Sequence, residues 1–239
     1  FNKEYFGKYK NVINKIYYSL GMKNSNILDL GCGYLNNIFW KEDYNIDGID
    51  IDLGIIDKFN NLSNKNNKKV YIKDISQISA KKDFNWLEDY DLSLPLEKKY
   101  DLVISNMSFH NVFKNENGFD NMIKFINKNT TINCQMVMTF IDKELLFKSE
   151  DNINLLNGSY IRKLNNNAVK IYYTWTQNKP IVEYILDYEN ITNLMNEKGW
   201  IIKEDLSKMV NNIKLNENNP WIQVRDSIKI INFIKINKI

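Results

Sequence analysis

The sequence predicts an α/β protein with a doubly wound, mostly parallel sheet and an antiparallel β insertion after the fifth strand. As far as Ile141, apolar runs of strand length alternate with helix-like stretches, a spacing that requires crossover connections and so parallel strands. Between Gly158 and Leu186 the pattern changes to short alternating segments separated by Asn-rich turns, which is typical of antiparallel hairpins. At 239 residues the chain is long enough for one sizeable core. We therefore expect a single domain over residues 1–239, with an insertion at about 142–186.

Composition excludes several classes of protein. The chain is 44% hydrophobic and 26% charged, which is typical of a globular protein. No apolar stretch approaches the roughly 20 residues of a membrane-spanning helix, so we expect no membrane association. One histidine and two cysteines cannot form an ordinary zinc site or a disulfide framework, which predicts no metal and a cytoplasmic location. The net charge of +3 is too small for a protein that binds long nucleic acid by charge alone, so any such contact should be local.

The first half of the chain predicts two helices and five strands. The first helix covers Tyr9–Leu20, where apolar residues recur at helical spacing before Gly21, and a second covers Gly118–Asn127. A loop-rich stretch surrounds Trp86–Leu96. The expected strands are apolar runs that end in glycine, acidic or polar residues: Asn26–Leu30, Ile46–Ile51, Lys69–Lys73, Tyr100–Ser105 and Cys134–Ile141.

After the insertion, the sequence predicts one more helix and one more strand. The helix covers Glu189–Lys198 and stops at Gly199, a typical C-terminal cap. The tail, Ser227–Ile236, is rich in β-branched residues, and we expect it to add an antiparallel edge strand to the sheet.

Glycines and acidic residues follow three of the predicted strands. Gly31 and Gly33 close the strand that contains Asp29, at the sheet edge where doubly wound folds bind nucleotides. Asp50 lies about twenty residues later, where a carboxylate binds ribose hydroxyls. Asp74, after the third strand, is within reach of an adenine amino group. A dinucleotide leaves Asp29 unexplained, whereas the ammonium of S-adenosylmethionine would pair with it. The pattern therefore predicts S-adenosylmethionine as the cofactor and S-adenosylhomocysteine as its product.

Four blocks of sequence carry a family resemblance: Ile27–Gly33, Gly48–Asp52, Tyr100–His110 and Pro180–Leu186. The first two are shared broadly by class I S-adenosylmethionine-dependent methyltransferases. With the last two, the chain resembles the messenger-RNA cap guanine-N7 methyltransferases, particularly the methyltransferase domains of multifunctional capping enzymes from poxviruses and other large AT-rich cytoplasmic DNA elements. The resemblance implies a class I fold and methyl transfer to N7 of the terminal guanine of GpppN-capped RNA, which forms cap 0.

The resemblance also implies individual site residues. Lys10 and Asn106 join the cofactor site, Lys10 near the methionine carboxylate. The residues implied for the cap-guanine pocket are His110, Glu183, Pro180 and Met107. Aromatic candidates for stacking on the guanine are Phe109, Phe113, Trp175 and Trp221, and lysine candidates for the triphosphate bridge are Lys170 and Lys179.

Guanine chemistry explains two of these residues independently. Guanine presents N1–H and N2–H₂ donors on one edge, which the carboxylate of Glu183 can accept together, while His110 can donate to O6. N7 carries no proton at neutral pH, so we expect no catalytic acid or base, only proximity and orientation. In isolation, Glu183 would be interpreted as an exposed strand residue and His110 as a core histidine.

The expected partners follow from the same resemblance. They are 5′-capped RNA, triphosphatase and guanylyltransferase domains on the same polypeptide, and a stimulatory subunit. The start at Phe1 instead of Met suggests a fragment of a longer polypeptide, located in the host cytoplasm or the virion if the source is viral. Two alternatives remain open: a class I methyltransferase acting on another substrate, and a non-catalytic subunit with this fold. The second is suggested by the segment Tyr34–Ile38, which replaces the family's usual Gly-Lys-Gly-Gly-Asp-Leu.

Overall fold

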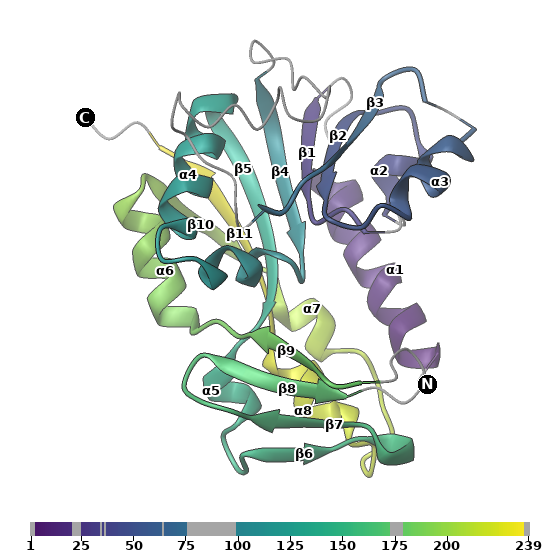
Figure 1. Cartoon of the computed structure of the whole chain (residues 1–239), viewed down its shortest axis with the longest axis vertical. Helices are drawn as coiled ribbons and strands as arrows, with labels where there is room; N and C mark the ends of the chain where they lie inside the picture. Colours follow the sequence, from purple (N-terminus) through teal and green to yellow (C-terminus); the bar gives the residue numbers. More distant parts are fainter. Residues whose placement is uncertain are drawn as a thin grey trace.

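The computed structural model describes residues 3–20, 25–33, 35, 37–63, 65–75, 99–172 and 179–236. Figure 1 shows a large sheet flanked by helices, with a smaller sheet below it. The strands of the large sheet are β1 (Asn26–Leu30), β2 (Asn45–Asp50), β3 (Lys68–Ile72), β4 (Tyr100–Asn106), β5 (Thr130–Ile141), β10 (Trp200–Asp205) and β11 (Ile228–Lys235). The expected loop-rich stretch around Trp86–Leu96 lies outside the described residues.

The large sheet is doubly wound, as the sequence predicts. Its seven strands lie in the order β3-β2-β1-β4-β5-β11-β10. All neighbours from β3 to β5 pair in parallel, and β11 is antiparallel to both β5 and β10. Since the chain order reverses at β1 and β4, their carboxyl ends form the crevice where such sheets bind ligands.

The C-terminal strand corrects one expectation. β11 is antiparallel, but it lies inside the sheet, because β10 pairs along its outer side and forms the edge. The sequence pattern did not predict β10. Its burial does not alternate, since Trp200 is fully buried while Ile201 and Ile202 are 38% and 41% exposed. A strand at a sheet edge needs no buried second face, so it lacks the pattern by which strands are recognised.

Consecutive residues of the central strands enter two separate cores, one on each face of the sheet. Ile27 belongs to the core beneath α1 (Lys3–Leu20), α7 (Ser207–Asn211) and α8 (Trp221–Ser227). Its neighbour Leu28 belongs to the core beneath α4 (Gly118–Asn129) and α6 (Tyr188–Glu197). Ile104 and Val103 divide in the same way. Burial on both faces explains why these strands read as continuous apolar runs in the sequence.

Two of the three long helices extend beyond the ranges expected from the sequence, and the third is shifted by one residue. The three long ones are α1 (Lys3–Leu20), α4 (Gly118–Asn129) and α6 (Tyr188–Glu197). The first begins well before the expected Tyr9, and the last stops before Gly199, whose φ of 87° lies in the left-handed region that favours glycine. The short helices are α2 (Ile38–Lys41), α3 (Ile55–Asn60), α5 (Lys143–Leu146), α7 (Ser207–Asn211), α8 (Trp221–Ser227) and the 3₁₀ helices η3 (Phe109–Lys114) and η4 (Leu156–Gly158). Among the described residues, no helix combines the length and the hydropathy needed to cross a membrane.

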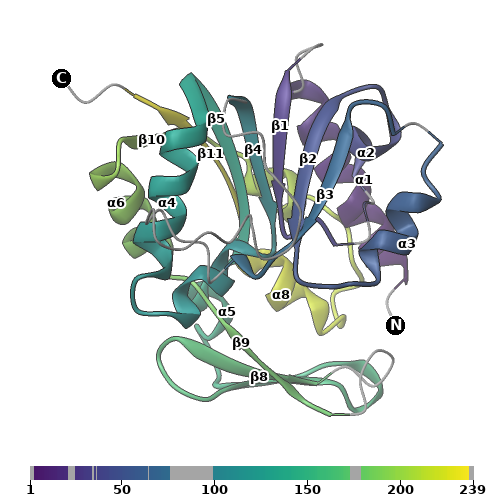
Figure 2. The ribbon, with the colours of Figure 1, turned by 45° about the horizontal axis from the view of Figure 1, so that its top comes forward.

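The expected insertion forms a second sheet of four antiparallel strands. They are β6 (Asn152–Asn154), β7 (Tyr160–Lys163), β8 (Ala168–Tyr172) and β9 (Ile181–Tyr184). The chain enters and leaves this sheet at one point, because Asp142 and Leu186 form a parallel bridge and Lys143 N donates to Leu186 O at 2.9 Å. Figure 2 shows the small sheet below the large one, on the side where β9 approaches the carboxyl end of β4.

Candidate active site

The turn after β1 packs tightly against the segment after β4. Gly31 has a φ of 68°, and a Cβ built on it would lie 2.3 Å from Cβ of Ser108. Ser108 Oγ in turn lies 2.5 Å from Leu30 O and 2.7 Å from Ser105 Oγ. Only glycine fits this position, and its bare backbone lies at the edge where the parallel strands end.

A cavity of about 370 Å³ opens at the carboxyl ends of the parallel strands. Four residues expected to bind the cofactor lie in its wall: Gly31, Asp50, Asp74 and Asn106. The other residues of the wall are Ile51, Lys73, Ile75, Met107, Ser108, Asn111, Lys114 and Glu183. Ile51 and Ile75 offer apolar contact surface, which the flat faces of an adenine require. Ile51 directly follows Asp50, and Ile75 directly follows Asp74. The sequence analysis identified the two acidic residues but not the two isoleucines.

Asp50 is fixed at the end of β2 by backbone hydrogen bonds. Its Oδ2 accepts from Gly33 N at 2.7 Å, and its Oδ1 accepts from Asp52 N at 3.0 Å. Each carboxylate oxygen can accept more than one hydrogen bond, so both remain able to accept from ribose hydroxyls.

Asp29 lies beneath the glycine turn and does not line the cavity. It is 2% exposed, and its Oδ2 accepts hydrogen bonds from Trp40 Nε1 at 2.7 Å and Asn37 Nδ2 at 2.8 Å. Burial raises the pKa of Asp29 to about 6, even though the hydrogen bonds from Trp40 and Asn37 lower it. An ammonium group that approached through the turn would stabilise the ionised form. The sequence missed Trp40 and Asn37, which sit in a segment without a recognisable motif.

The two cofactor residues implied by resemblance have different environments. Asn106 ends β4 in the cavity wall, and its Oδ1 accepts from Tyr9 Oη at 2.8 Å, which ties α1 to the cavity. Lys10, next to that tyrosine, is exposed on α1 and lines neither this cavity nor the one described next.

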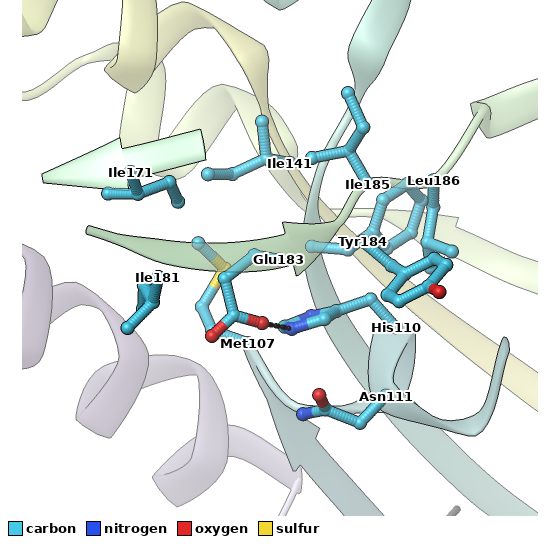
Figure 3. Close-up of a pocket in the computed structure, with 11 residues that line it drawn as sticks. Met107, His110, Asn111, Ile141, Ile171, Ile181, Glu183, Tyr184, Ile185 and Leu186 are labelled. Carbon is cyan, nitrogen blue, oxygen red and sulfur yellow. Dashed lines mark hydrogen bonds and ion pairs between the residues drawn. The ribbon is translucent and has the colours of Figure 1, made fainter. Parts of the chain in front are cut away.

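A second cavity of about 230 Å³ lies between η3, β5 and β9 (Figure 3). Its lining residues are Met107, His110, Asn111, Phe140, Ile141, Ile171, Ile181, Glu183, Tyr184, Ile185 and Leu186. Met107, Asn111 and Glu183 line both cavities, so the two spaces adjoin. Met107 lies at this junction with a φ of 55°, and its backbone N donates to Thr139 O at 2.9 Å.

His110 and Glu183 lie together in the second cavity. Their Nε2 and Oε2 atoms are 2.9 Å apart, and Figure 3 shows the two side chains meeting there. Burial raises the pKa of Glu183, but the hydrogen bond from His110 and the charges of His110 and Lys114 outweigh it and leave the pKa below its usual value. Since Glu183 is therefore ionised at neutral pH, its carboxylate accepts and His110 Nε2–H donates.

Several residues expected at the cap site do not line either cavity. Phe109 and Trp221 are buried in the cores and cannot stack on a ligand, and Phe113 stacks on Phe119 at 5.4 Å between ring centroids. The candidate Trp175 lies outside the described residues. Pro180, Lys170 and Lys179 line neither cavity. Two aromatic side chains do line the second cavity, Phe140 and Tyr184, and the sequence analysis singled out neither.

The described residues bring no three His, Cys, Asp or Glu side chains into a group that could hold a metal ion. Cys32 and Cys134 are both buried, and neither forms a disulfide.

Comparisons with known proteins bear on the fold. No protein-family model and no curated protein matches the sequence. Among solved structures, an S-adenosylmethionine-dependent methyltransferase from Clostridium acetobutylicum is 12% identical, with a TM-score of 0.60 over 97% of this chain and 92% of that one. The CcbJ methyltransferase from Streptomyces caelestis is 10% identical, with a TM-score of 0.60 over 96% and 89% of the two chains.

The glycopeptide N-methyltransferase MtfA is 8% identical to this chain, with a TM-score of 0.59 over 95% of this chain and 90% of MtfA. MtfA has also been solved with S-adenosylmethionine and with S-adenosyl-L-homocysteine. The similarity covers nearly the whole of this chain in each case. The chain has the class I S-adenosylmethionine-dependent methyltransferase fold.

Proposed function

We propose that the protein is an S-adenosylmethionine-dependent methyltransferase that methylates N7 of the terminal guanine of GpppN-capped RNA. One observation carries the proposal: the ionised, half-buried carboxylate of Glu183 lies in a cavity that adjoins the cofactor cavity. A carboxylate held there by His110 can accept from two donors on one edge of a base, and guanine is the base that presents N1–H and N2–H₂ together.

S-adenosylmethionine, when bound, supplies the methyl group as an electrophilic sulfonium. Asp50 accepts from the ribose hydroxyls, Asp74 accepts from the adenine amino group, and Ile51 and Ile75 pack on the adenine faces. Asp29 balances the charge of the ammonium from beneath the glycine turn. For Lys10, which lines neither cavity, a contact with the methionine carboxylate has the support of the resemblance alone.

The hydrogen bond between His110 and Glu183 determines which acceptor positions of the carboxylate remain for guanine. Oε2 of Glu183 already accepts from His110, so guanine uses Oε1 and the remaining lone pair of Oε2. His110 then acts as a positioning residue that fixes the plane of the carboxylate. Donation from His110 to guanine O6, which guanine chemistry suggested, requires the imidazole to turn from Glu183 to the base when the cap enters.

The transfer itself needs orientation more than proton chemistry. Guanine N7 has a free lone pair at neutral pH, so no side chain has to remove a proton before attack. Holding N7, the methyl carbon and the sulfur in line can supply about 7–11 kcal/mol of the barrier. Three isoleucines exclude water from the second cavity: Ile141, Ile171 and Ile185, which lie on one side of Glu183 in Figure 3.

A second candidate function is methylation of a hydroxyl or amine on another substrate. The favouring observation is again the pair of His110 and Glu183, because a histidine oriented by a carboxylate is the usual arrangement of a general base. A hydroxyl or a protonated amine must lose a proton for methylation and so needs a base, whereas guanine N7 does not. Activity that collapses in His110→Asn would favour this candidate, whereas the cap function expects a partial loss.

The partners remain part of the proposal. The substrate is 5′-capped RNA, the triphosphatase and guanylyltransferase activities belong to the same polypeptide, and a stimulatory subunit raises activity in the cytoplasm. A non-catalytic role for the domain predicts cofactor binding without turnover.

The decisive experiment is a methyl-transfer assay on GpppN-capped RNA with labelled S-adenosylmethionine, followed by digestion and identification of the methylated nucleoside. The proposal expects 7-methylguanosine. A methyl group on ribose, or turnover only with uncapped small molecules, would favour the second candidate. Cofactor binding with no transfer, in the presence of every partner domain, would favour the non-catalytic role.

A further inference from the structure

The small sheet has an outer face, and of its strand residues on that face Tyr184, at the end of β9, also lines the second cavity. In antiparallel strands, directly paired residues point to the same side and neighbours along a strand point to opposite sides. Ile161, Ile171 and Val169 belong to the inner side, because they are buried in the core that also contains Trp221 of α8. In Figure 1, α5 and α8 lie behind the small sheet, so the opposite, outer face looks toward the viewer.

The register places a defined set of side chains on that outer face. Tyr160 pairs with Tyr172, and Arg162 pairs with Lys170. Lys170 also pairs with Val182 on β9. We call these five residues, Tyr160, Arg162, Lys170, Tyr172 and Val182, the outer platform.

Aromatic and cationic groups of the outer platform contact one another. The rings of Tyr160 and Tyr172 lie 5.5 Å apart, tilted by 34°. The guanidinium carbon of Arg162 lies 4.3 Å from the centre of the Tyr160 ring. Arg162 is exposed and Val182 is 51% exposed. The platform therefore presents two tilted rings beside an apolar side chain, and the planar cation of Arg162 lies over one face of the Tyr160 ring.

The charge of the platform is uniformly positive. Among the residues of β6 to β9, the one carboxylate is Glu183, and it points to the inner side because it is next to Val182 and pairs with Val169. Arg162 and Lys170 thus have no acidic neighbour across the strands. Lys163, which follows Arg162, points inward and pairs with Asp151 at 3.4 Å.

We propose that the outer platform binds the single-stranded RNA chain that follows the cap. Rings that offer π-faces beside Arg and Lys side chains on an open sheet suit single-stranded nucleic acid, since bases stack on the rings and phosphates meet the cations. A double helix would hide the base faces that the rings need. The inference rests on the proposed cap-methylating function, because that function delivers an RNA chain to this sheet.

The position of the platform fits a transcript whose cap is held on the inner side. Val182 and Glu183 are consecutive on β9, so one residue of the platform lies directly behind the residue proposed to read guanine. From Val182 to Arg162 the platform crosses two strand spacings, about 10 Å. RNA that leaves the second cavity over β9 therefore reaches the rings of Tyr160 and Tyr172 within a few nucleotides.

The test measures affinity for an uncapped single-stranded RNA of about 10 nucleotides, the site size of one such sheet, by fluorescence anisotropy across salt concentrations. Tyr172→Leu should weaken binding about tenfold, because one base loses its stacking partner. Arg162→Gln should weaken binding and lower the slope of log K against log salt by about 0.7. Lys163→Gln makes the same charge change on the neighbouring residue but on the inner side, and it should leave the affinity and slope unchanged.

Equal losses in Arg162→Gln and Lys163→Gln would overturn the platform, since they would indicate unspecific charge attraction. So would wild-type affinity in Tyr172→Leu with an unchanged melting temperature. Binding of phosphatidylserine vesicles without RNA binding would instead assign the face to a membrane. Arg162 is exposed, so Arg162→Gln tests the platform even if Tyr172→Leu fails to fold.

A second measurement separates this inference from the proposed function. Methyl transfer to the dinucleotide GpppA should be the same in Arg162→Gln and in the wild type, whereas KM for capped RNA should rise several-fold. If neither substrate is methylated by any variant, the proposed function fails, and the anisotropy data on uncapped RNA still decide the platform.

Discussion

Nε2 of His110 lies 2.9 Å from Oε2 of Glu183, although 73 residues separate them in the chain. One comes from the 3₁₀ helix that follows β4 and the other from the last strand of the small sheet. The contact therefore joins the two sheets at the point where the proposed cofactor cavity adjoins the second cavity. It makes Glu183 a fixed, ionised acceptor, and it sets what the site can recognise.

Replacing that carboxylate while keeping its volume should damage recognition of the cap. In Glu183→Gln, one acceptor becomes a donor that faces a guanine donor, which we expect to cost roughly 2–4 kcal/mol in kcat/KM for capped RNA. The affinity for S-adenosylmethionine, measured by calorimetry, should change far less. Glu144→Gln is the matched control, because Glu144 is 75% exposed on α5. Equal kcat/KM values in the two variants would be incompatible with the proposed role.

Asp50 offers a direct test of the cofactor site. Asp50→Ala removes charge-assisted hydrogen bonds to the ribose and should weaken S-adenosylmethionine and S-adenosylhomocysteine binding by about 1.5–3 kcal/mol. Titration calorimetry on wild type and variant measures this. Asp57→Ala, on the exposed helix α3, provides a control of the same charge change. No heat and no thermal shift with either ligand, even for the wild type, would refute the cofactor assignment.

The buried Asp29 predicts a pH dependence of stability. Its pKa rises from the usual 3.8 to about 6 on folding, so the folded protein holds this proton more tightly than the unfolded chain. The stabilisation is complete below about pH 4 and is lost as pH rises through 6, about 3 kcal/mol in total. Urea unfolding between pH 4 and 7 should show this decrease in the wild type and lack it in Asp29→Asn. The same decrease in both proteins would assign it to other groups.

The same residue predicts how pH affects cofactor binding. The ammonium of S-adenosylmethionine favours ionised Asp29, so affinity should fall up to tenfold per unit as pH drops below about 6. Asp29→Asn should bind more weakly at pH 8 and show a much smaller pH dependence. An unchanged pH profile in the variant would mean that Asp29 supports Trp40 and the turn but not the ligand.

The close approach at Gly31 predicts a large structural effect from a small substitution. Gly31→Ala puts a Cβ 2.3 Å from Cβ of Ser108 and forces alanine to a φ of 68°, which together should cost about 2–4 kcal/mol of unfolding free energy. Ser108→Gly in the same chain removes the clash and should restore part of the loss. If the double variant is no more stable than Gly31→Ala alone, the contact with Ser108 is not the cause.

The sequence was most informative where strands are buried on both faces. β1, β2 and β4 were predicted within one residue, because their apolar residues are buried on both faces of the sheet and glycine, acidic or polar residues mark their ends. β10 was missed because Ile201 to Asp205 are exposed, and the position of β11 inside the sheet depends on that pairing. Propensity within one strand carries no information about which strand pairs on its other side.

For the site, the strand-end acids were predictable because parallel strands bring their carboxyl ends to one edge. The placement of His110 and Glu183 in one pocket followed from a family resemblance, and their contact with each other was not predicted, since nothing local to either residue implies the other. The buried partners of Asp29, namely Trp40 and Asn37, were not predictable. They depend on how the segment after the glycines folds back, which no motif specifies.

The proposal that Glu183 reads the cap guanine can be tested most directly with a cap that lacks one donor. Inosine differs from guanine only in the missing N2 amino group, so kcat/KM for guanosine-capped and inosine-capped RNA isolates that contact. The wild type should prefer guanosine by about tenfold or more, because one hydrogen bond to a charged group is lost with inosine. Glu183→Ala should lose most of this preference along with much of its activity. Equal preference ratios in the wild type and in Glu183→Ala would show that Glu183 does not read the base.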